Sequence, residues 1–364
     1  MKNIISAERD IWQYLAECGK KIVMYGMGNG ADKILNICEK KGIEISDFFA
    51  SDGFVRGHSF HGKTVLTYSE IKKKYSDFVV LLSFATSLPD VLQRIDEIAS
   101  ETELLVPDVP VFGETLFDMD FCKAHIGEIK ETYELFEDEK SKEIFRSVIN
   151  AKLTGKTEFL NESVCSKEEV YNEILQPDKY ISYADLGAYN GDTVRELAEF
   201  APNMKNVFAL EPDKRTFKKL SIYAENEKRF NVFCHNCAAW DKNETLYFDG
   251  SGNRNSNVSV SNETLSGKKP IEIAARSLDD ILCEEKVDYI KYDVEGSEKE
   301  ALYGSKETIK NYSPDLLVSL YHRSEDIFSL PKLVRELGDY KFYLRRFRYY
   351  PAWDLNLYCI KKDQ

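Results

Sequence analysis

Two glycine-rich turns, each lying between an apolar run and a helical pattern, constrain the fold most strongly. The first turn, 26–31, follows the apolar run 21–26, and the second, 185–191, follows the apolar run 180–186. Apolar strands that alternate with amphipathic helices are typical of parallel sheets with crossover helices. The sequence therefore predicts an α/β protein with one such sheet in each half of the chain.

Length and pattern together predict two α/β domains and a helical connector. At 364 residues the chain exceeds what one hydrophobic core usually serves. From about residue 111 the glycine-rich turns give way to long helical stretches, in one of which Ile144, Phe145, Val148 and Ile149 mark an apolar face. We predict a smaller Rossmann-like domain at 1–110, a connector at 111–178 and a second α/β domain at 179–364.

Individual strands can be placed by their apolar runs. In the first domain a second strand is expected at 43–49. In the second domain the expected strands are 180–186, 206–210, 230–233, 287–293 and 316–321. Between residues 244 and 277, short alternating runs separated by Gly, Ser and Asn predict a hairpin region beside the site.

Charge and hydropathy disfavour nucleic-acid and membrane partners. Acidic residues outnumber basic ones by 62 to 49, and the net charge of -13 would repel a phosphate backbone. No apolar run approaches the roughly 20 residues of a membrane helix, and the charged start does not resemble a signal peptide. We expect a cytoplasmic protein. The pair Cys234 and Cys237 lacks a partner pair, so we expect neither a metal nor a redox role for it.

The second glycine turn has the features of a nucleoside site. It opens with Asp185, and no phosphate-binding lysine follows, so a cationic or neutral guest is expected. The ammonium group of a sulfonium amino acid would fit Asp185. The next strand ends at Glu211, where a carboxylate can accept both ribose hydroxyls, and a third strand leads to small side chains at 237–239 that could admit adenine.

This ordered set of motifs resembles the FkbM-type methyltransferases. The resemblance rests on the turn, on Glu211 and Pro212, and on the segments 236–241, 277–280, 290–298, 320–326 and 354–359, and it spans most of residues 130–361. It implies a class I, seven-stranded methyltransferase sheet, S-adenosylmethionine as donor, and methylation of a hydroxyl of a sugar, glycan or related small molecule. The donor-binding residues that we predict are Asp185, Gly187, Ala188, Tyr189, Asn190, Gly191, Asp192, Thr193, Glu211, Pro212, Cys237, Ala238 and Ala239.

One position departs from the family pattern. The usual third small residue of the turn is here Tyr189. If that position required a positive φ, tyrosine would be costly there. Either the turn takes another path or the ring covers the donor.

Three residues at the ends of the fourth and fifth strands are candidates for catalysis: Asp293, Glu295 and His322. A general base typically contributes about 10²- to 10⁴-fold to transfer onto a hydroxyl. Our hypothesis is that Asp293 or His322 takes the acceptor proton. The alternative is structural: one carboxylate caps a helix that opens at Ser297, and the histidine is a hydrogen-bonded core residue.

The acceptor region offers a weaker signal. Between 340 and 353, basic residues alternate with Tyr, Phe and Trp, which is compatible with a surface that stacks on a sugar. A partly buried edge strand with a solvated face is the simpler interpretation. We expect a small-molecule or glycan acceptor, with a nucleotide-linked sugar among the candidates.

The first glycine turn fits a dinucleotide pattern, with Gly26, Gly28, Asn29 and Gly30 after a strand and Asp52 in place for a ribose contact. This half more nearly looks like the nucleotide-sugar-binding domain found before some sugar acetyltransferases. A module for packing or for formation of a homo-oligomer remains an alternative.

Two interpretations of the whole chain compete with a methyltransferase. A nicotinamide-dependent oxidoreductase would use the first turn, but it gives Glu211 and 293–298 no purpose. A non-catalytic scaffold that has kept two nucleotide folds predicts no affinity for a methyl donor.

Overall fold

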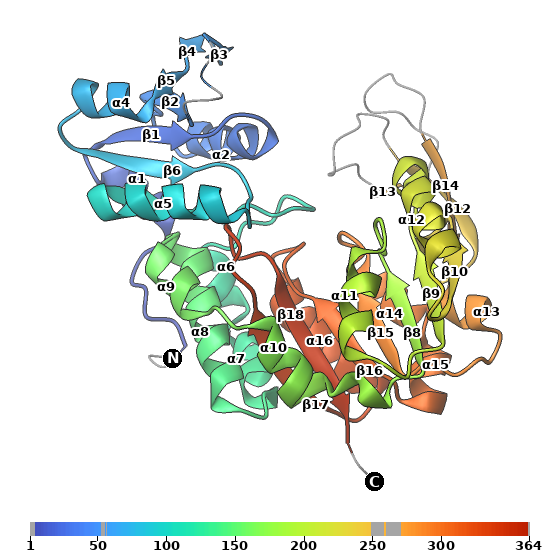
Figure 1. Ribbon diagram of the computed structural model, residues 1–364. Helices are drawn as coiled ribbons and strands as arrows, with labels where there is room; N and C mark the ends of the chain where they lie inside the picture. Colours follow the sequence, from blue (N-terminus) through green and yellow to red (C-terminus); the bar gives the residue numbers. More distant parts are fainter. Residues whose placement is uncertain (1–3, 52–54, 56, 249–257, 260–270, 363–364) are drawn as a thin grey trace.

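The computed structural model describes residues 4–51, 55, 57–248, 258–259 and 271–362 (Figure 1). Two parallel-sheet regions, one from each half of the chain, lie on different sides of the molecule, and helices from the middle of the chain pack beside them (Figure 1). No helix in these residues is long and apolar enough to cross a membrane.

The N-terminal sheet is entirely parallel, with the order β5-β2-β1-β6-β7. Its strands are β1 (Lys21–Tyr25), β2 (Asp47–Ala50), β5 (Leu66–Thr67), β6 (Phe78–Leu82) and β7 (Glu103–Leu105). Alternate residues of β1 and β6 enter two separate cores. Helices α1 (Ile11–Glu17) and α2 (Asn29–Lys40) cover one face, and α4 (Tyr68–Lys74) and α5 (Pro89–Glu101) cover the other.

The strand expected at 43–49 is shorter than predicted. β2 begins only at Asp47, and residues 43–46 form a loop. Ile43 and Ile45 are nevertheless buried in the core beside α1 and α2. Their burial, which does not require strand pairing, is what the apolar pattern detected.

The C-terminal sheet has seven strands in the order β10-β9-β8-β15-β16-β18-β17. β17 and β18 are antiparallel to their neighbours, and the other strands are parallel. This confirms the predicted seven-stranded α/β sheet. The strands are β8 (Ser182–Leu186), β9 (Asn206–Leu210), β10 (Asn231–His235), β15 (Tyr289–Tyr292), β16 (Asp315–Ser319), β17 (Tyr340–Arg346) and β18 (Leu355–Lys361). The helices beside them are α11 (Asp192–Phe200), α12 (Lys214–Asn226), α14 (Glu298–Tyr303), α15 (Lys306–Tyr312) and α16 (Asp326–Leu337).

A separate small sheet stands where the hairpin region was expected. β12 (Glu244–Phe248) pairs antiparallel with both β13 (Val258–Ser259) and β14 (Ile271–Arg276), and β11 (Ala238–Ala239) pairs parallel with β14. The predicted hairpin is therefore present in its described strands. Residues 249–257 and 260–270 lie outside the described part of the chain. The short helix α13 (Leu278–Leu282) follows β14.

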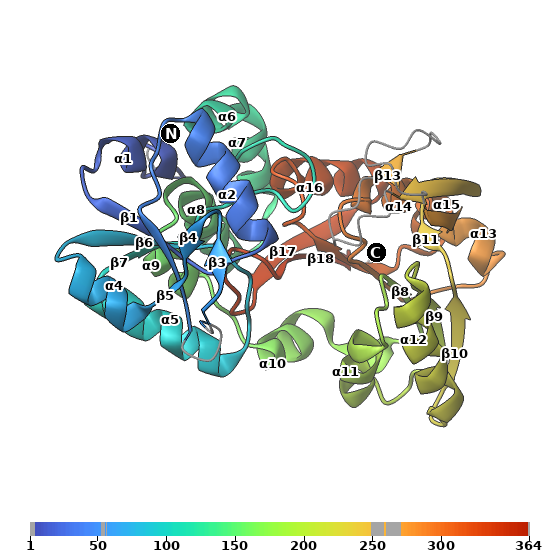
Figure 2. The same cartoon turned by 90° about the horizontal axis from the view of Figure 1, so that it is seen from above.

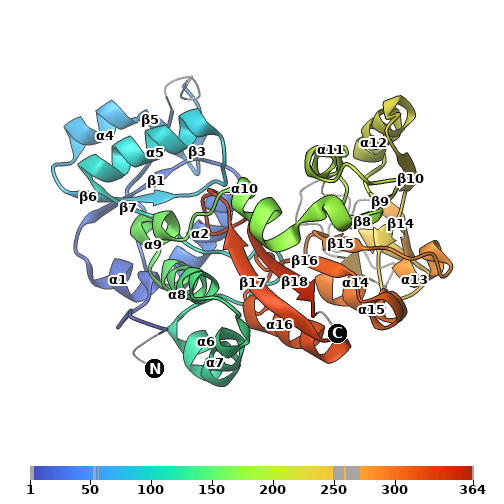
Figure 3. The ribbon, with the colours of Figure 1, turned by 60° about the horizontal axis from the view of Figure 1, so that its bottom comes forward.

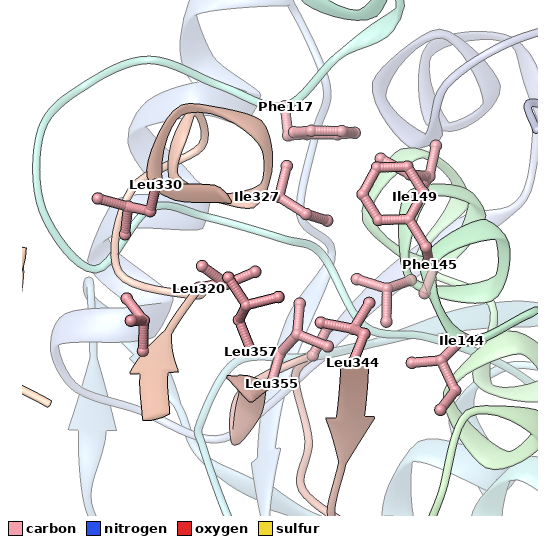
Figure 4. Close-up of a cluster of buried hydrophobic side chains, with 14 of the residues drawn as sticks. Phe117, Ile144, Phe145, Ile149, Leu320, Ile327, Leu330, Leu344, Leu355 and Leu357 are labelled. Atoms are coloured by element: carbon pink, nitrogen blue, oxygen red, sulfur yellow. The ribbon is translucent and has the colours of Figure 1, made fainter. Parts of the chain in front are cut away.

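Helices from the middle of the chain share a core with the C-terminal sheet (Figure 4). Ile144, Phe145 and Ile149 of α8 (Glu139–Thr154) lie close to leucines of β17 and β18 and to Ile327 of α16. The Ser141 hydroxyl accepts a hydrogen bond from the Leu344 amide at 2.8 Å. The remaining middle elements are α6 (Met119–Ala124), α7 (Ile126–Leu135), α9 (Thr157–Glu162), α10 (Lys167–Glu169), η1 (Val170–Leu175) and η2 (Pro177–Lys179). The domain boundaries themselves stay a prediction.

The strand expected at the sheet edge differs from the prediction in one respect. β17 is at the edge, but α8 packs against it, and of its three basic residues Arg345 and Arg346 are buried while Lys341 is partly exposed. Arg345 is buried and pairs with Asp138 and Glu169, while the fully buried Arg346 donates to the Leu160 carbonyl. Two basic residues of the alternating pattern are therefore buried by polar contacts with distant segments, and a local sequence pattern cannot distinguish this burial from exposure.

The N-terminal sheet region contacts the C-terminal one directly. β17 and β18 lie between the N-terminal sheet and the rest of the C-terminal sheet (Figures 2 and 3). Thr86 and Tyr350 exchange two backbone hydrogen bonds, of 2.8 and 3.0 Å. Farther along the chain, the Phe112 amide donates to the His322 carbonyl at 3.0 Å. The segment that leaves the N-terminal sheet therefore packs against the strand end that carries His322.

Candidate active site

Asp185 and Lys291 form a buried ion pair under the glycine turn. They sit on neighbouring parallel strands, β8 and β15, and are directly opposite in register. The Lys291 ammonium lies 3.3 Å from the Asp185 carboxylate, and the Thr193 hydroxyl donates to the same carboxylate. Asp185 therefore already has a cation of the chain itself beside it. Its predicted contact with a donor ammonium group would have to be shared with Lys291.

The glycine turn packs against the end of β15. Gly187 has a φ of 88°, and a Cβ there would lie 2.0 Å from the Asp293 carbonyl oxygen, so no other residue fits without movement. Tyr189 has a φ of 46°, which is the left-handed conformation that made tyrosine a concern. The residue is 45% exposed. The turn thus has a positive φ at Tyr189 although this residue carries a side chain. The resulting strain is tolerated where the surrounding structure fixes the backbone.

Glu211 follows the last residue of β9 and is buried. Its carboxylate accepts the Asp213 amide at 2.8 Å. Burial raises the pKa of Glu211 to about 7, although the backbone N–H groups of Asp213 and Tyr189 oppose the shift. The side chain is therefore balanced between its neutral and ionised forms near neutral pH.

The third strand tip is built from small buried residues. Asn236, just before it, donates to the Glu211 carbonyl at 2.8 Å, which joins the second and third tips. Cys237, Ala238 and Ala239 are all buried. Burial raises the pKa of Cys237 to about 11, so the thiol stays neutral.

Asp293 follows β15 and lies among three polar side chains. The Tyr321 hydroxyl donates to its carboxylate at 2.9 Å, the Lys291 ammonium lies at 3.6 Å and His322 Nε2 at 3.7 Å. Burial alone would raise the pKa of Asp293, but Lys291 and His322 hold it below its usual value. Its side chain is 30% exposed. Asp293 is therefore an accessible carboxylate that stays ionised.

The turn after Asp293 has an unusual backbone. Glu295 has a φ of 51° and Gly296 a φ of 95°. The N–H groups of Val294 and Gly296 donate to the carboxylate of Glu298, at 3.0 and 3.1 Å. The structural alternative was that Asp293 or Glu295 caps the helix opening at Ser297, but the N-cap of α14 makes no side-chain capping hydrogen bond. Glu298 instead holds the turn before the helix, and the Asp293 carboxylate has side-chain partners. Non-glycine residues with a left-handed backbone, such as Glu295, cluster at functional sites.

His322 is buried between two carboxylates. Its Nδ1 lies 2.9 Å from Glu298, close enough for a strong charge contact although the two groups are not aligned as a hydrogen bond. Burial would lower the pKa of His322, but Glu298 and Asp293 raise it to about 9. The imidazole is therefore protonated at neutral pH and cannot accept a further proton. Of the two predicted bases, the geometry favours Asp293.

A metal could in principle use this cluster. Asp293, Glu298 and His322 each offer one ligand atom within 4.8 Å of the others. A protonated imidazole does not bind metals, and the Lys291 ammonium already supplies positive charge to Asp293. The absence of a metal stays a prediction.

A cavity of about 480 Å³ lies beside Asp293 and the start of α11; residues 185–191 of the glycine turn are not part of its lining. It is lined by Asp192, Thr193, Asp293, Glu295 and His322, so five of the predicted site residues meet there. Glu211, Pro212 and residues 237–239 are not part of this lining; they lie at the two neighbouring strand tips. Glu295 links the two groups, because its charge contributes to the raised pKa of Glu211.

Two contributors had no assigned role in the sequence analysis. Lys291 stands inside an apolar strand run, where an unexplained lysine is itself a signal of a buried ion pair. Tyr321 precedes His322 at the next strand end and orients Asp293. A tyrosine at a strand end is too common to be recognised without the fold.

The first glycine turn is also beside a cavity. Gly26 and Gly28 have φ angles of 112° and 105°, and a Cβ on Gly30 would lie 2.2 Å from the Ser83 carbonyl oxygen. Asn29 and Gly30 begin α2 and line a cavity of about 350 Å³. Asp52, the predicted ribose contact, lies outside the described residues.

Comparison with known families addresses the identity of both halves. Residues 185–349 match the family described as the methyltransferase FkbM domain. The chain contains an FkbM methyltransferase domain. This confirms the resemblance and makes the C-terminal sheet that of a methyltransferase. Residues 18–103 match a second family, described as C2185-like, N-terminal.

Solved structures extend the likeness to the whole chain. Methyltransferase FkbM from Methylobacillus flagellatus KT is 19% identical, with a TM-score of 0.71 over 99% of this chain and 95% of that one. At this identity the likeness speaks for the fold alone, N-terminal sheet included. Aeropyrum pernix fibrillarin in complex with S-adenosyl-L-methionine is 12% identical over 50% of this chain and 68% of that one, and its TM-score of 0.33 carries no inference. No curated protein is significantly similar in sequence.

Proposed function

We propose that the FkbM domain transfers a methyl group from S-adenosylmethionine to a hydroxyl of a sugar, glycan or related small molecule. The observation that carries this proposal is the Asp293 carboxylate. It is ionised and accessible, and it lines a cavity, while the backbone carbonyl of the same residue lies against Gly187 of the glycine turn. Such a group beside the methyl donor accelerates transfer onto a hydroxyl by accepting its proton.

The residues of the site fit a cationic nucleoside. Glu211 would accept the ribose hydroxyls in its ionised form, and the small side chains of Ala238 and Ala239 would lie against a flat base. Carboxylic acids outnumber basic groups in the lining of the cavity by five to three: Asp192, Glu196, Asp293, Glu295 and Asp354 against Lys167, Lys291 and His322. This excess of negative charge favours a sulfonium over an anionic ligand.

The main contribution of the protein to methyl transfer is to position the donor and the acceptor. When bound, the donor supplies a methyl group whose bond to the positive sulfur breaks, with its electron pair left on sulfur, as the acceptor oxygen forms the new C–O bond. Asp293 accepts the hydroxyl proton, and Tyr321 holds the carboxylate in one orientation. Because Lys291 and His322 lower the pKa of Asp293, its strength as a base is limited. Positioning, worth roughly 7–11 kcal/mol, therefore contributes more than proton removal.

Calorimetric titration of the whole chain with S-adenosylmethionine and, separately, with NADH tests the proposal. We expect saturable binding of S-adenosylmethionine and none of NADH. Binding of NADH alone would instead support the oxidoreductase that uses the first glycine turn. A chain that binds neither compound would be a scaffold, and the proposal would be rejected.

Donor affinity should depend on pH through Glu211. With a pKa of about 7, its carboxylate is mostly neutral at pH 6 and mostly ionised at pH 8. If the ionised form accepts the ribose hydroxyls, affinity should rise about tenfold across this range, the ratio of the ionised fractions. Glu211→Gln should bind more weakly at pH 8 and lose the pH dependence.

The control for this prediction is Glu199→Gln, the same chemical change at an exposed position of α11. It should behave as the unsubstituted protein at both pH values. Equal donor affinity of Glu211→Gln and the unsubstituted protein at pH 8 would remove Glu211 from the donor site.

A further inference from the structure

The cavity at the FkbM site is not closed by the FkbM domain alone. Ala85, which follows β6 of the N-terminal sheet, and Val111 of the connecting segment both line it. The second cavity, beside the first glycine turn, is lined by these same two residues. Trp353 lines both as well. The two cavities are therefore adjacent, with these three side chains between them.

Aromatic side chains cover the wall of the first cavity on the side of this junction. The rings of Tyr321 and Trp353 are near-parallel with centroids 6.2 Å apart, and Tyr349 lies 5.7 Å from Trp353. The Tyr321 hydroxyl is the group that contacts Asp293. A sugar ring that stacks on Trp353 would thus have its hydroxyls close to the proposed base, Asp293. Flat apolar rings beside carboxylates suit a carbohydrate, which has apolar faces and polar edges.

The two cavities differ in charge. Five carboxylic acids line the first. The second has none among its described lining residues, although the chain as a whole carries a net charge of -13. Its charged lining residue is Lys33, on the first turns of α2. The Lys33 ammonium donates to the carbonyls of Pro110 and Val111, at 2.7 and 2.9 Å, which holds it at the junction.

The sheet topology adds an independent argument. β1 and β6 are the central strands, and the chain leaves β1 toward one edge of the sheet and returns through β6 toward the other. In open parallel sheets, ligands bind outside the carboxyl ends of the strands at such a switch point. The second cavity has this position, because its lining follows β1 at Met27 and β6 at Ser83.

We infer that the methyl acceptor is a nucleotide-linked sugar that occupies both cavities. Its sugar ring lies on Trp353 with a hydroxyl toward Asp293, and its nucleotide lies in the second cavity with the phosphates near Lys33. The positive donor and the negative phosphates are then in cavities of opposite charge preference. This inference rests on the proposed function for its reaction, but binding alone can test it.

The test is calorimetry on the whole chain saturated with S-adenosylhomocysteine. The probes are UDP-glucose, dTDP-glucose and GDP-mannose, the matching nucleoside diphosphates, and the matching methyl glycosides. We expect at least one nucleotide-linked sugar to bind more tightly than its diphosphate or its methyl glycoside. Lys33→Met should weaken binding of that nucleotide-linked sugar by about 10- to 100-fold, because one charge-assisted contact is lost. Lys33→Arg, which keeps the charge, should retain most of the affinity.

The aromatic half of the site is tested separately. Trp353→Ala should weaken binding of the nucleotide-linked sugar by about three- to tenfold, and Trp353→Phe should recover part of this affinity. Because Trp353 lines the second cavity as well, both Trp353 variants should weaken binding of the nucleoside diphosphate alone by less than they weaken binding of the nucleotide-linked sugar. Failure of every nucleotide-linked sugar to bind, in a protein that still binds S-adenosylhomocysteine, would overturn the inference and leave the proposed function standing. Affinities that are unchanged in Lys33→Met and Trp353→Ala would also overturn it. Loss of S-adenosylhomocysteine binding would instead reject the proposed function.

Discussion

Asp293→Asn should lower the rate of methyl transfer by about 10²- to 10⁴-fold, the usual contribution of a general base, and leave donor affinity nearly unchanged. Asparagine preserves the shape of the side chain and can still accept the hydrogen bond from Tyr321, but it cannot take a proton. The measurement is formation of S-adenosylhomocysteine with an acceptor that the unsubstituted chain methylates. Donor binding is measured by calorimetry in parallel.

Two further variants make this result specific. Asp339→Asn, the same change at an exposed residue that pairs with Lys362, should retain full turnover. Tyr321→Phe removes the 2.9 Å hydrogen bond but keeps the base, so its loss should be smaller than that of Asp293→Asn. If Asp293→Asn turns over at the unsubstituted rate, the proton leaves by another route and the assignment is wrong.

The α/β architecture could be predicted because its signals are local. A buried strand such as 206–210 and an amphipathic helix such as α11 differ in the period of their apolar residues, and that period is legible in a short window. The predictions that were wrong concern burial that arises from distant segments. Ile43 and Ile45 are buried in a loop, and Arg345 is buried under ion pairs with two residues about 200 and 180 positions away.

The site could be predicted in outline for the same reason. The motifs at 185–193 and 290–298 place their residues at strand ends, and parallel strand ends meet at one sheet edge. What the motifs could not give is register. Only the pairing of β8 with β15 sets Lys291 beside Asp185, and only the fold brings Glu298 to His322. The choice between two candidate bases depended on that second contact.

His322→Gln should destabilise the fold by about 3–5 kcal/mol at pH 7, because it leaves the Glu298 carboxylate buried without its cation. The pKa of His322, about 9 in the folded chain, is above its ordinary value of 6.5. The stabilisation from its proton, about 3 kcal/mol, is therefore fully present below pH 6.5 and is lost as pH rises through 9. Urea unfolding at a series of pH values measures the free energy of unfolding of both proteins. The difference in this free energy between the unsubstituted protein and His322→Gln should shrink as the pH rises through 9. His125→Gln, at a half-exposed histidine 3.4 Å from Glu128, is the control and should have little effect.

A second substitution separates the ion pair from simple loss of packing. Glu298→Gln in the His322→Gln background removes the unpaired charge, and an amide oxygen at the position of Oε1 can still accept from the N–H groups of Val294 and Gly296, which both donate to that atom. Since the cost of breaking a buried pair comes mainly from the charge left behind, the double variant should be more stable than His322→Gln alone. Strictly additive losses would mean that His322 is neutral in the folded chain. In that case it would again be a candidate for the base, and Asp293 would no longer be the favoured one.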